Sequence, residues 1–276
     1  MSDLPFGRFY FDYVGALGAG GLGKVDKILV TRSNAPSKPV GSEWACKRLN
    51  AQWAAHSGAR ERFEREIKAL KIMSHPNIVS CEGENTAEGT ERFYVMPFYS
   101  GTLRRYIASG GHRGDWRFFA SLAVGLTAAL EYAHGLGIRH RDLKPDNILF
   151  NGGGPLIIAD WGFGYFVHKH SKVLQQLTRG GMGTEYYCSL EQWGTGKCDE
   201  PGDVYSLGMT IDECVTGSQR SIMIGMGVNG PSAAEKGDGA RAFNALLRAM
   251  TRPVATQRVQ RMADVAAELQ RALAST

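Results

Sequence analysis

The chain has few cysteines, and none of them form the close pairs typical of metal sites. It contains 276 residues and only five cysteines, an odd number. This usage excludes the disulfide framework of a small secreted domain and a zinc site built from paired cysteines. It is typical of free thiols in a reducing compartment and predicts a cytoplasmic protein. The five are Cys46, Cys81, Cys188, Cys198 and Cys214.

The chain also lacks long apolar runs and dense blocks of one charge. Its longest apolar stretch, around 120–130, is too short to span a bilayer. The first residues, Met1–Pro5, lack the basic and then apolar layout of a secretory signal. Lys and Arg number 32 against 27 Asp and Glu, a net charge of +5, and the basic residues are scattered. We therefore expect no membrane segment in this chain and no nucleic-acid partner.

Strand signals dominate the first hundred residues. Phe63, Ile67 and Leu70 mark one helix among them, which we expect to stop at 75–77, the sequence His-Pro-Asn. The remaining runs are short, β-branched or aromatic, and separated by Gly, Asn and Pro. They predict strands over 8–14, 25–31, 44–49, 78–82 and 93–96.

After Gly101 the apolar rhythm becomes helical. Three stripes predict helices that each bury one face, with Asp115 as the N-cap of the first and Gly217 beyond the end of the second. A strand-rich unit followed by a helical unit, joined near 99–101, predicts two lobes with a cleft between them. The stripes are Phe118, Leu122, Leu126, Ala129 and Ala133; Val204, Leu207, Ile211 and Cys214; and Met262, Ala266, Leu269 and Leu273.

A glycine-rich run at 18–25 reads Gly-Ala-Gly-Gly-Leu-Gly-Lys-Val and matches G-x-G-x-x-G-x-V. A dinucleotide-binding fold would need a helix after the glycines, but 25–31 has a strand pattern. A Walker loop would need a hydroxyl after Lys24, where the chain has Val25. Two interpretations stay open: an ordinary hairpin turn, or a glycine turn whose backbone N–H groups approach phosphates.

The most specific motif lies at 140–149, His-Arg-Asp-Leu-Lys-Pro-Asp-Asn-Ile-Leu, and Asp-Trp-Gly follows at 160–162. With the glycine-rich run, the chain resembles the catalytic domain of a eukaryotic-type (Hanks-type) serine/threonine protein kinase from about Phe9 to Leu273. Its Tyr-Ser-Leu-Gly and Glu-Gln details resemble bacterial members. The resemblance implies an α+β, bilobal fold in a single domain, 1–276. A β-rich N-lobe with one main helix spans about 9–98, a hinge 99–101, and a mostly helical C-lobe 102–273.

The resemblance implies ATP-dependent phosphorylation of Ser/Thr hydroxyls on protein substrates, with Mg²⁺ or, in its place, Mn²⁺. Such transfer needs positioning and charge neutralisation rather than covalent help from the protein. The catalytic and metal-binding roles fall on six matching positions. Lys47 would hold the α/β-phosphates, Glu66 would orient Lys47, Asp142 would accept the hydroxyl proton, Lys144 would neutralise the γ-phosphate, and Asn147 and Asp160 would bind metal.

Other matching positions are expected to bind the nucleotide or to shape the catalytic centre. Those expected to bind ATP are Gly18, Gly20 and Gly23 at the phosphates, Val25, Ala45 and Leu149 around the adenine, Met96 behind it, and Pro97 to Tyr99 at the hinge. Leu70, His140 and Trp161 match a buried stack. Asp203 is expected to cap its helix and to bond the backbone of the catalytic loop.

Two departures from the family pattern leave alternatives open. Trp161 replaces the usual phenylalanine, and Ser-Leu-Glu at 189–191 replaces Ala-Pro-Glu, although Glu191 is still expected to pair with Arg258. One alternative is therefore a nucleotide-binding pseudokinase or scaffold. Another is a small-molecule kinase of the same fold, but such enzymes generally lack the features seen here at Arg141, Lys144 and 183–191. Residues 183–191 resemble the segment that receives the substrate peptide in the family.

The segment between Gly162 and Gly183 has two hydroxyls of the Ser/Thr kind, Ser171 and Thr178. In the family, an arginine at the position of Arg141 meets a phosphate on this segment. We therefore predict autophosphorylation mainly at Thr178 and secondarily at Ser171, because a phosphate would order the segment through Arg141.

Overall fold

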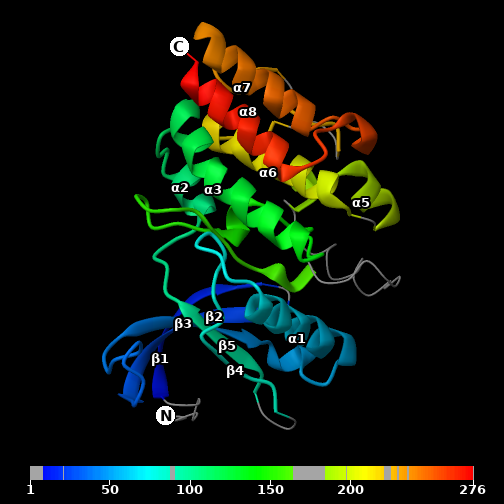
Figure 1. The fold of residues 1–276 in the computed structure, drawn as a ribbon. Coiled ribbons are helices and arrows are strands. Elements are labelled where there is room, and N and C mark those ends of the chain that lie inside the picture. The colour runs from blue at the N-terminus through cyan, green and yellow to red at the C-terminus, as the bar shows by residue number, and fades with distance from the viewer. Residues whose placement is uncertain are drawn as a thin grey trace. The chain divides into compact units, whose positions relative to one another are not determined.

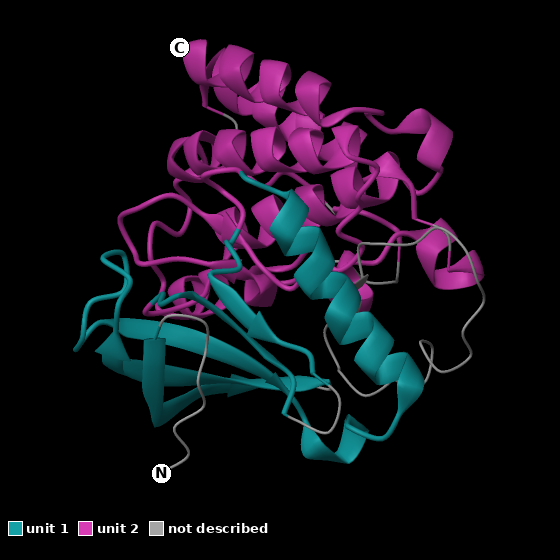
Figure 2. Ribbon diagram, turned by 60° about the horizontal axis from the view of Figure 1, so that its bottom comes forward, with its two compact units in different colours: residues 1–74, 79–99 teal, residues 75–78, 100–276 magenta. Residues whose placement is uncertain are grey.

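The computed structural model describes residues 9–20, 22–87, 91–163, 184–196, 198–220, 225–228, 230–234 and 236–275. The chain divides into two compact units (Figure 2). Unit 1 comprises 1–74 and 79–99, and unit 2 comprises 75–78 and 100–276. Among the described residues, no helix combines the length and the apolar character that a bilayer crossing needs.

Unit 1 is an antiparallel five-stranded sheet in the order β1-β2-β3-β5-β4, with a helix (Figure 1). The predicted strand at 78–82 is wrong, because β4 begins only at Gly83. Ile78 instead makes an isolated bridge to Ile158, so this apolar run reflects single buried residues and not a ladder. The elements are β1 (Phe9–Ala19), β2 (Gly23–Ser33), β3 (Glu43–Leu49), η1 (Ala51–Trp53), α1 (Ser57–Ile72), β4 (Gly83–Asn85) and β5 (Phe93–Pro97).

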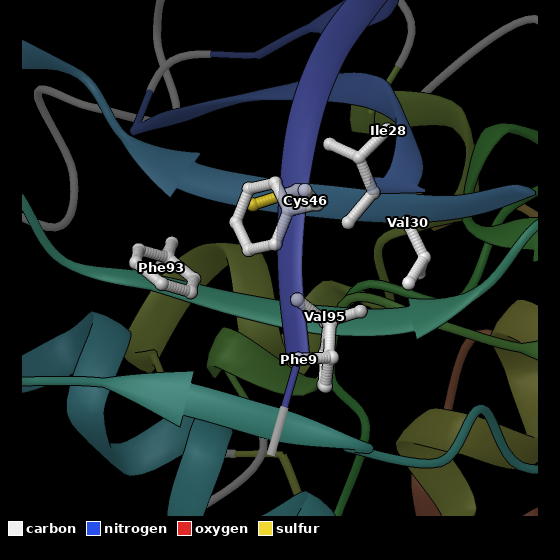
Figure 3. Packing of buried hydrophobic residues seen from close by; sticks show 7 residues of the cluster. Phe9, Ile28, Val30, Cys46, Phe93 and Val95 are labelled. Atoms are coloured by element: carbon white, nitrogen blue, oxygen red, sulfur yellow. The ribbon is translucent and has the colours of Figure 1, made fainter. Parts of the chain in front are cut away.

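One hydrophobic core cluster of unit 1 lies on one face of this sheet. Figure 3 shows side chains of β1, β2, β3 and β5 gathered there, and the rings of Phe11 and Phe93 meet edge to face at 5.7 Å. Because side chains alternate along a strand, the positions between these core residues point to the opposite face. The core residues are Phe9, Phe11, Ile28, Val30, Cys46, Phe93 and Val95.

Helix α1 confirms the predicted helix of unit 1. It buries Phe63, Ile67 and Leu70, as the spacing predicts, and it ends at Ile72 before the His-Pro-Asn sequence. Its N-cap is His56, whose ring nitrogen accepts a hydrogen bond from the backbone N–H of Ala59. The same buried face carries one charged residue, Glu66.

Unit 2 is mostly helical (Figure 1). It also contains a short two-stranded hairpin. Both predicted helix ends are confirmed: Asp115 accepts from the N–H of Phe118 at 3.0 Å, and Gly217 follows α6 at φ 73°. The elements are α2 (Leu103–Ala108), α3 (Trp116–Gly135), η2 (Pro145–Asn147), β6 (Ile148–Leu149), β7 (Ile157–Ile158), η3 (Trp161–Phe163), η4 (Thr184–Tyr187), α5 (Leu190–Thr195), α6 (Glu200–Thr216), α7 (Gly237–Met250), η5 (Ala255–Gln257) and α8 (Met262–Ala274).

The residues predicted to be buried on α3 and α8 are only partly those that the structure buries. Helix α3 buries Phe119 and Ala123, whereas Phe118 and Leu122 are only half-buried. Helix α8 similarly buries 265 and 272 in place of 266 and 273. Apolar residues cover a wide arc of each helix, so periodicity finds the helix but not the centre of its buried face. The predicted α6 stripe is buried throughout.

Candidate active site

An ion pair joins the central sheet of unit 1 to α1. The Lys47 amine on β3 donates to both carboxylate oxygens of Glu66, at 2.7 and 2.9 Å. The hydroxyl of Tyr94 on β5 donates to the same carboxylate at 2.8 Å. The Glu66 carboxylate is almost fully buried, so it acts as a fixed counter-charge and holds the Lys47 amine in one place.

Three of the predicted nucleotide contacts share the sheet face of Lys47. Val25 lies opposite Lys47 in the β2–β3 register, and Ala45 lies opposite Met96 in the β3–β5 register. This is the face opposite the core shown in Figure 3. Pro97 ends β5. The structure therefore forms an apolar strip beside the amine, as the adenine interpretation requires.

The glycine-rich run is a turn between two strands, β1 and β2, as predicted. Gly23 is required by the fold, because a Cβ there would lie 2.7 Å from the carbonyl oxygen of Arg48. A Cβ on Gly18 would meet nothing within 4 Å, and one on Gly20 only a carbonyl at 3.8 Å. Packing among the described residues thus does not demand these two glycines, and their bare backbone suits close approach of a phosphate.

The loop at 140–147 in unit 2, which the resemblance predicts to be catalytic, surrounds the Asp142 carboxylate with hydrogen-bond donors. Lys144 donates to both oxygens at 3.1 and 3.2 Å. Asn147 donates its amide N–H to the carboxylate at 3.0 Å and to the Asp142 carbonyl at 2.7 Å. Burial raises the pKa of Asp142; the Lys144 charge opposes that rise and the Asp160 charge adds to it.

Asp203 on α6 holds the loop by its backbone. Its carboxylate accepts from the N–H groups of His140 and Arg141, both at 2.8 Å, as predicted, and from the His134 ring at 2.8 Å. Burial raises the pKa of Asp203, but the contacts with His134, His140 and the Arg141 N–H together outweigh burial and hold the pKa below its ordinary value. The predicted capping role is wrong, because Asp199 is the N-cap and Asp203 lies within the first turn.

The predicted metal ligands lie at neighbouring ends of the β6–β7 hairpin. The Ala159 N–H donates to the Asn147 carbonyl at 2.9 Å, and Asp160 follows at φ 61°. Arg141 is also left-handed, at φ 67°, and such strain in non-glycine residues concentrates at functional sites. The bonds of Asn147 to Asp142 use its amide nitrogen, so neither engages the amide oxygen.

The donor chemistry fits a divalent cation bound together with a nucleotide. Carboxylate and amide oxygens are the ligands that Mg²⁺ prefers, and phosphates commonly complete its shell. Within the described part of the chain, no group of three or more His, Cys, Asp or Glu side chains forms a self-sufficient metal site. Asn147 and Asp160 offer oxygen ligands of this kind, and phosphate oxygens would complete the shell of the cation.

Trp161 is accommodated next to the loop. Its ring meets the His140 ring at 4.7 Å and 64°, and both side chains are fully buried. The indole N–H donates to the Ile158 carbonyl at 3.4 Å. Two members of the predicted stack thus lie together in unit 2, while Leu70 is buried in unit 1. The indole N–H is the polar group that tryptophan adds at this position, and it has a hydrogen-bond acceptor.

Several residues contribute to the site without having been assigned a role from sequence. Tyr94 supports Glu66, and His134 supports Asp203. Gln192 of α5 donates to the Arg141 carbonyl at 2.5 Å and so fixes the strained residue before Asp142. Only Tyr94 had a usable signal, because it faces Lys47 in the strand register. The predicted phosphorylation sites Thr178 and Ser171 lie outside the described residues.

The predicted pairing of Glu191 with Arg258 is confirmed. The guanidinium donates to the two carboxylate oxygens at 2.5 and 2.9 Å, and the Arg258 side chain is fully buried. It also donates to the carbonyls of Arg252, Pro253 and Pro201. Loss of the family's proline at 190 has therefore not removed this ion pair.

We expect Glu191→Gln to lower the free energy of unfolding by about 3 kcal/mol at neutral pH, because a buried guanidinium loses its counter-charge. Burial raises the pKa of Glu191, but the hydrogen bonds and charge of Arg258, together with the Ser189 hydroxyl and the Glu191 backbone N–H, outweigh burial and hold the pKa below its ordinary value. The pair's contribution is thus present above the unfolded-state pKa of about 4.3 and is lost as pH falls through the folded-state pKa. Urea unfolding at neutral and acid pH measures both effects.

Glu268→Gln is the matched control, since Glu268 pairs with Arg271 on the exposed surface of α8. We expect it to change the free energy by less than about 0.5 kcal/mol. Equal effects of the two substitutions, or a Glu191→Gln effect that does not shrink in acid, would contradict this account.

Known proteins are similar to this chain in both sequence and structure. The protein kinase domain family matches residues 11–223. The chain is 32% identical over 267 residues to the serine/threonine-protein kinase PknK of Mycobacterium tuberculosis, covering 96% of this chain and 22% of PknK. It is also 32% identical over 223 residues to a probable serine/threonine-protein kinase PknB of Bifidobacterium longum, covering 78% of this chain and 31% of that protein. The chain thus spans less than a third of these relatives.

Among solved structures, the chain resembles the kinase domain of M. tuberculosis PknI with a TM-score of 0.68 at 20% identity. The match covers 99% of this chain and 98% of that one. It confirms the predicted α+β kinase fold.

Proposed function

Since this chain belongs to the protein kinase domain family and its curated relatives are serine/threonine kinases, we propose that it transfers the γ-phosphoryl group of ATP to serine and threonine hydroxyls of proteins. The observation that carries the proposal is the Asp142 carboxylate, held by Lys144 and Asn147 in the catalytic loop. We further propose that 1–276 is one kinase domain, with an N-lobe of about 9–98, a hinge at 99–101 and a C-lobe of 102–273.

Each unit supplies a separate part of the chemistry. In unit 1, Lys47 binds the α/β-phosphates with its direction set by Glu66, and the backbone of the 18–23 turn approaches the phosphates. Val25, Ala45 and Met96 contact the adenine from the sheet. Leu149 is a further adenine contact in this proposal, and the backbone from Pro97 to Tyr99 bonds the polar edge of the adenine.

In unit 2, Asp142 accepts a hydrogen bond from the acceptor hydroxyl and takes its proton late in the transfer, because the transition state is largely dissociative. Lys144, already bound to the Asp142 carboxylate, also neutralises charge on the moving γ-phosphate. Asn147 and Asp160 would hold Mg²⁺, or Mn²⁺ in its place, and that cation would neutralise phosphate charge.

Regulation and location extend the same proposal. We propose autophosphorylation at Thr178, and secondarily at Ser171, read out through Arg141. The scattered cysteines support a cytoplasmic location, and those in the described residues are free thiols.

The structure weighs against both alternatives. A pseudokinase need not preserve a buried, doubly bonded Lys47–Glu66 pair, and neither Trp161 nor the missing proline has disrupted its surroundings. A small-molecule kinase does not need the Glu191–Arg258 pair that anchors the segment for a substrate peptide.

Transfer of γ-labelled phosphate separates the three functions. We incubate the chain with labelled Mg-ATP, a generic basic protein and a pool of small metabolites. We then hydrolyse the labelled protein and identify the phosphoamino acid. Phosphoserine and phosphothreonine support the proposal. Nucleotide binding without any transfer would favour the pseudokinase, and label confined to a metabolite would favour the small-molecule kinase.

A further inference from the structure

A second charged cluster lies in unit 2 outside the residues assigned above. Arg104 on α2 donates to the Asp146 carboxylate through two nitrogens, at 3.1 and 3.2 Å. It also forms an ion pair with Glu213 on α6 and donates to the Tyr187 hydroxyl at 2.7 Å. That hydroxyl donates to Glu213 and accepts from Gln219 at 2.8 Å. We call these five residues the Arg104 cluster.

The cluster holds two carboxylates and one guanidinium. Glu213 is almost fully buried, with a side-chain exposure of 6%, whereas Asp146 is 50% exposed and Arg104 is 30% exposed. Burial and the Glu213 charge raise the pKa of Tyr187, so the phenol stays neutral. Arg104 is therefore the cation that balances the two carboxylates, and it does so from a partly solvent-accessible position.

The cluster adjoins the place where the acceptor must bind. Asp146 lies four residues after Asp142 in the catalytic loop and directly precedes Asn147. Tyr187 directly precedes Cys188, whose thiol has its pKa raised first by burial and then by the charge of the nearby Asp142 carboxylate. Tyr187 also belongs to the 183–191 segment that the kinase resemblance assigns to the substrate peptide. A peptide bound at Asp142 would thus run past the cluster.

We propose that Arg104 is a specificity-determining residue that occupies an anionic pair, Asp146 and Glu213, and so prevents a basic residue of the substrate from binding there. The proposal rests on the proposed protein kinase activity. Arg104 already uses three nitrogens in contacts with Asp146, Glu213 and Tyr187. Few of its N–H donors remain for an acidic side chain of the peptide. The wild-type site is therefore selective against basic side chains without attracting acidic ones.

Arg104→Gln tests the proposal, because it leaves the two carboxylates facing the peptide without their cation. The substrates are a neutral peptide with one serine and its variants with a single arginine at each flanking position. We expect one arginine position to gain about tenfold in kcat/KM with Arg104→Gln, as a charge-assisted hydrogen bond would give. The wild-type protein should show no such gain.

Two controls separate charge from general disturbance of the site. Arg105→Gln removes the same charge from the next residue of α2, whose exposed side chain forms no ion pair among the described residues. Arg104→Lys keeps a cation at the cluster. We expect both to retain the wild-type peptide preference, while thermal unfolding confirms that all variants are folded.

Direct binding of the same labelled peptides, followed by fluorescence anisotropy, decides the proposal independently of turnover. A tighter Kd for one arginine peptide with Arg104→Gln alone supports it, even if the wild-type chain transfers no phosphate and the proposed function fails. An unchanged preference in folded Arg104→Gln, a gain shared by Arg105→Gln, or a wild-type protein that already prefers arginine would overturn it.

Discussion

Asp142→Asn should lower kcat by about a thousandfold, in the range that general acid–base groups contribute, while the Kd for ATP changes by less than about twofold. The amide cannot take the hydroxyl proton, but its oxygen can still accept the Asn147 hydrogen bond that the carboxylate now accepts at 3.0 Å. The hydrogen bond from the Asn147 side-chain amide to the backbone carbonyl of residue 142 is also retained. The loss should therefore appear in chemistry and not in folding or nucleotide binding.

Single-turnover transfer of labelled phosphate and equilibrium binding of ATP measure the two quantities separately. Asp264→Asn serves as the control, because Asp264 is an exposed residue in the first turn of α8. Activity near the wild-type level after Asp142→Asn would mean that another group accepts the proton. An equal loss of ATP affinity would place Asp142 in nucleotide binding.

The kinase-like motifs and the alternation of residues along strands predicted much of the candidate active site. The strand pattern of 44–49 placed Lys47 on a strand, and the helical spacing around 63–70 placed Glu66 on a helix. The structure joins the two side chains at 2.7 Å. The same alternation separates the core residue Cys46 from its neighbours Ala45 and Lys47. Sequence succeeds here because a two-residue period and a fixed motif spacing are local properties.

The errors arise where tertiary contacts decide. The 78–82 run looked like a strand, but Ile78 is buried through a single bridge to Ile158. Asp is a residue type that commonly caps helices, yet the two carboxylate oxygens of Asp203 accept from loop N–H groups, one from His140 and one from Arg141. Gln192 lies 51 positions from Arg141 along the chain, so no local pattern could reveal their contact.

Substitutions in the Lys47–Glu66 ion pair are the second case in which we expect a large loss of activity. Lys47→Met should lower kcat/KM by about 100- to 1000-fold, the range for removal of one preorganised charge-stabilising donor. Glu66→Gln should have an effect of similar direction, because the amine then loses a buried counter-charge and its fixed direction. The double variant should be little worse than Lys47→Met, since Glu66 acts only through Lys47.

Tyr94→Phe distinguishes orientation of the pair from its charge. It removes the 2.8 Å hydrogen bond to Glu66 but keeps the ring and both charges, and one such bond is worth about 1 kcal/mol. We therefore expect about a fivefold loss of kcat/KM, and this loss should vanish in the Glu66→Gln background. Tyr132→Phe, on α3 in unit 2, provides a tyrosine control. If Lys47→Met and Glu66→Gln instead multiply their losses, the two side chains act independently, and Glu66 does not serve to orient the amine.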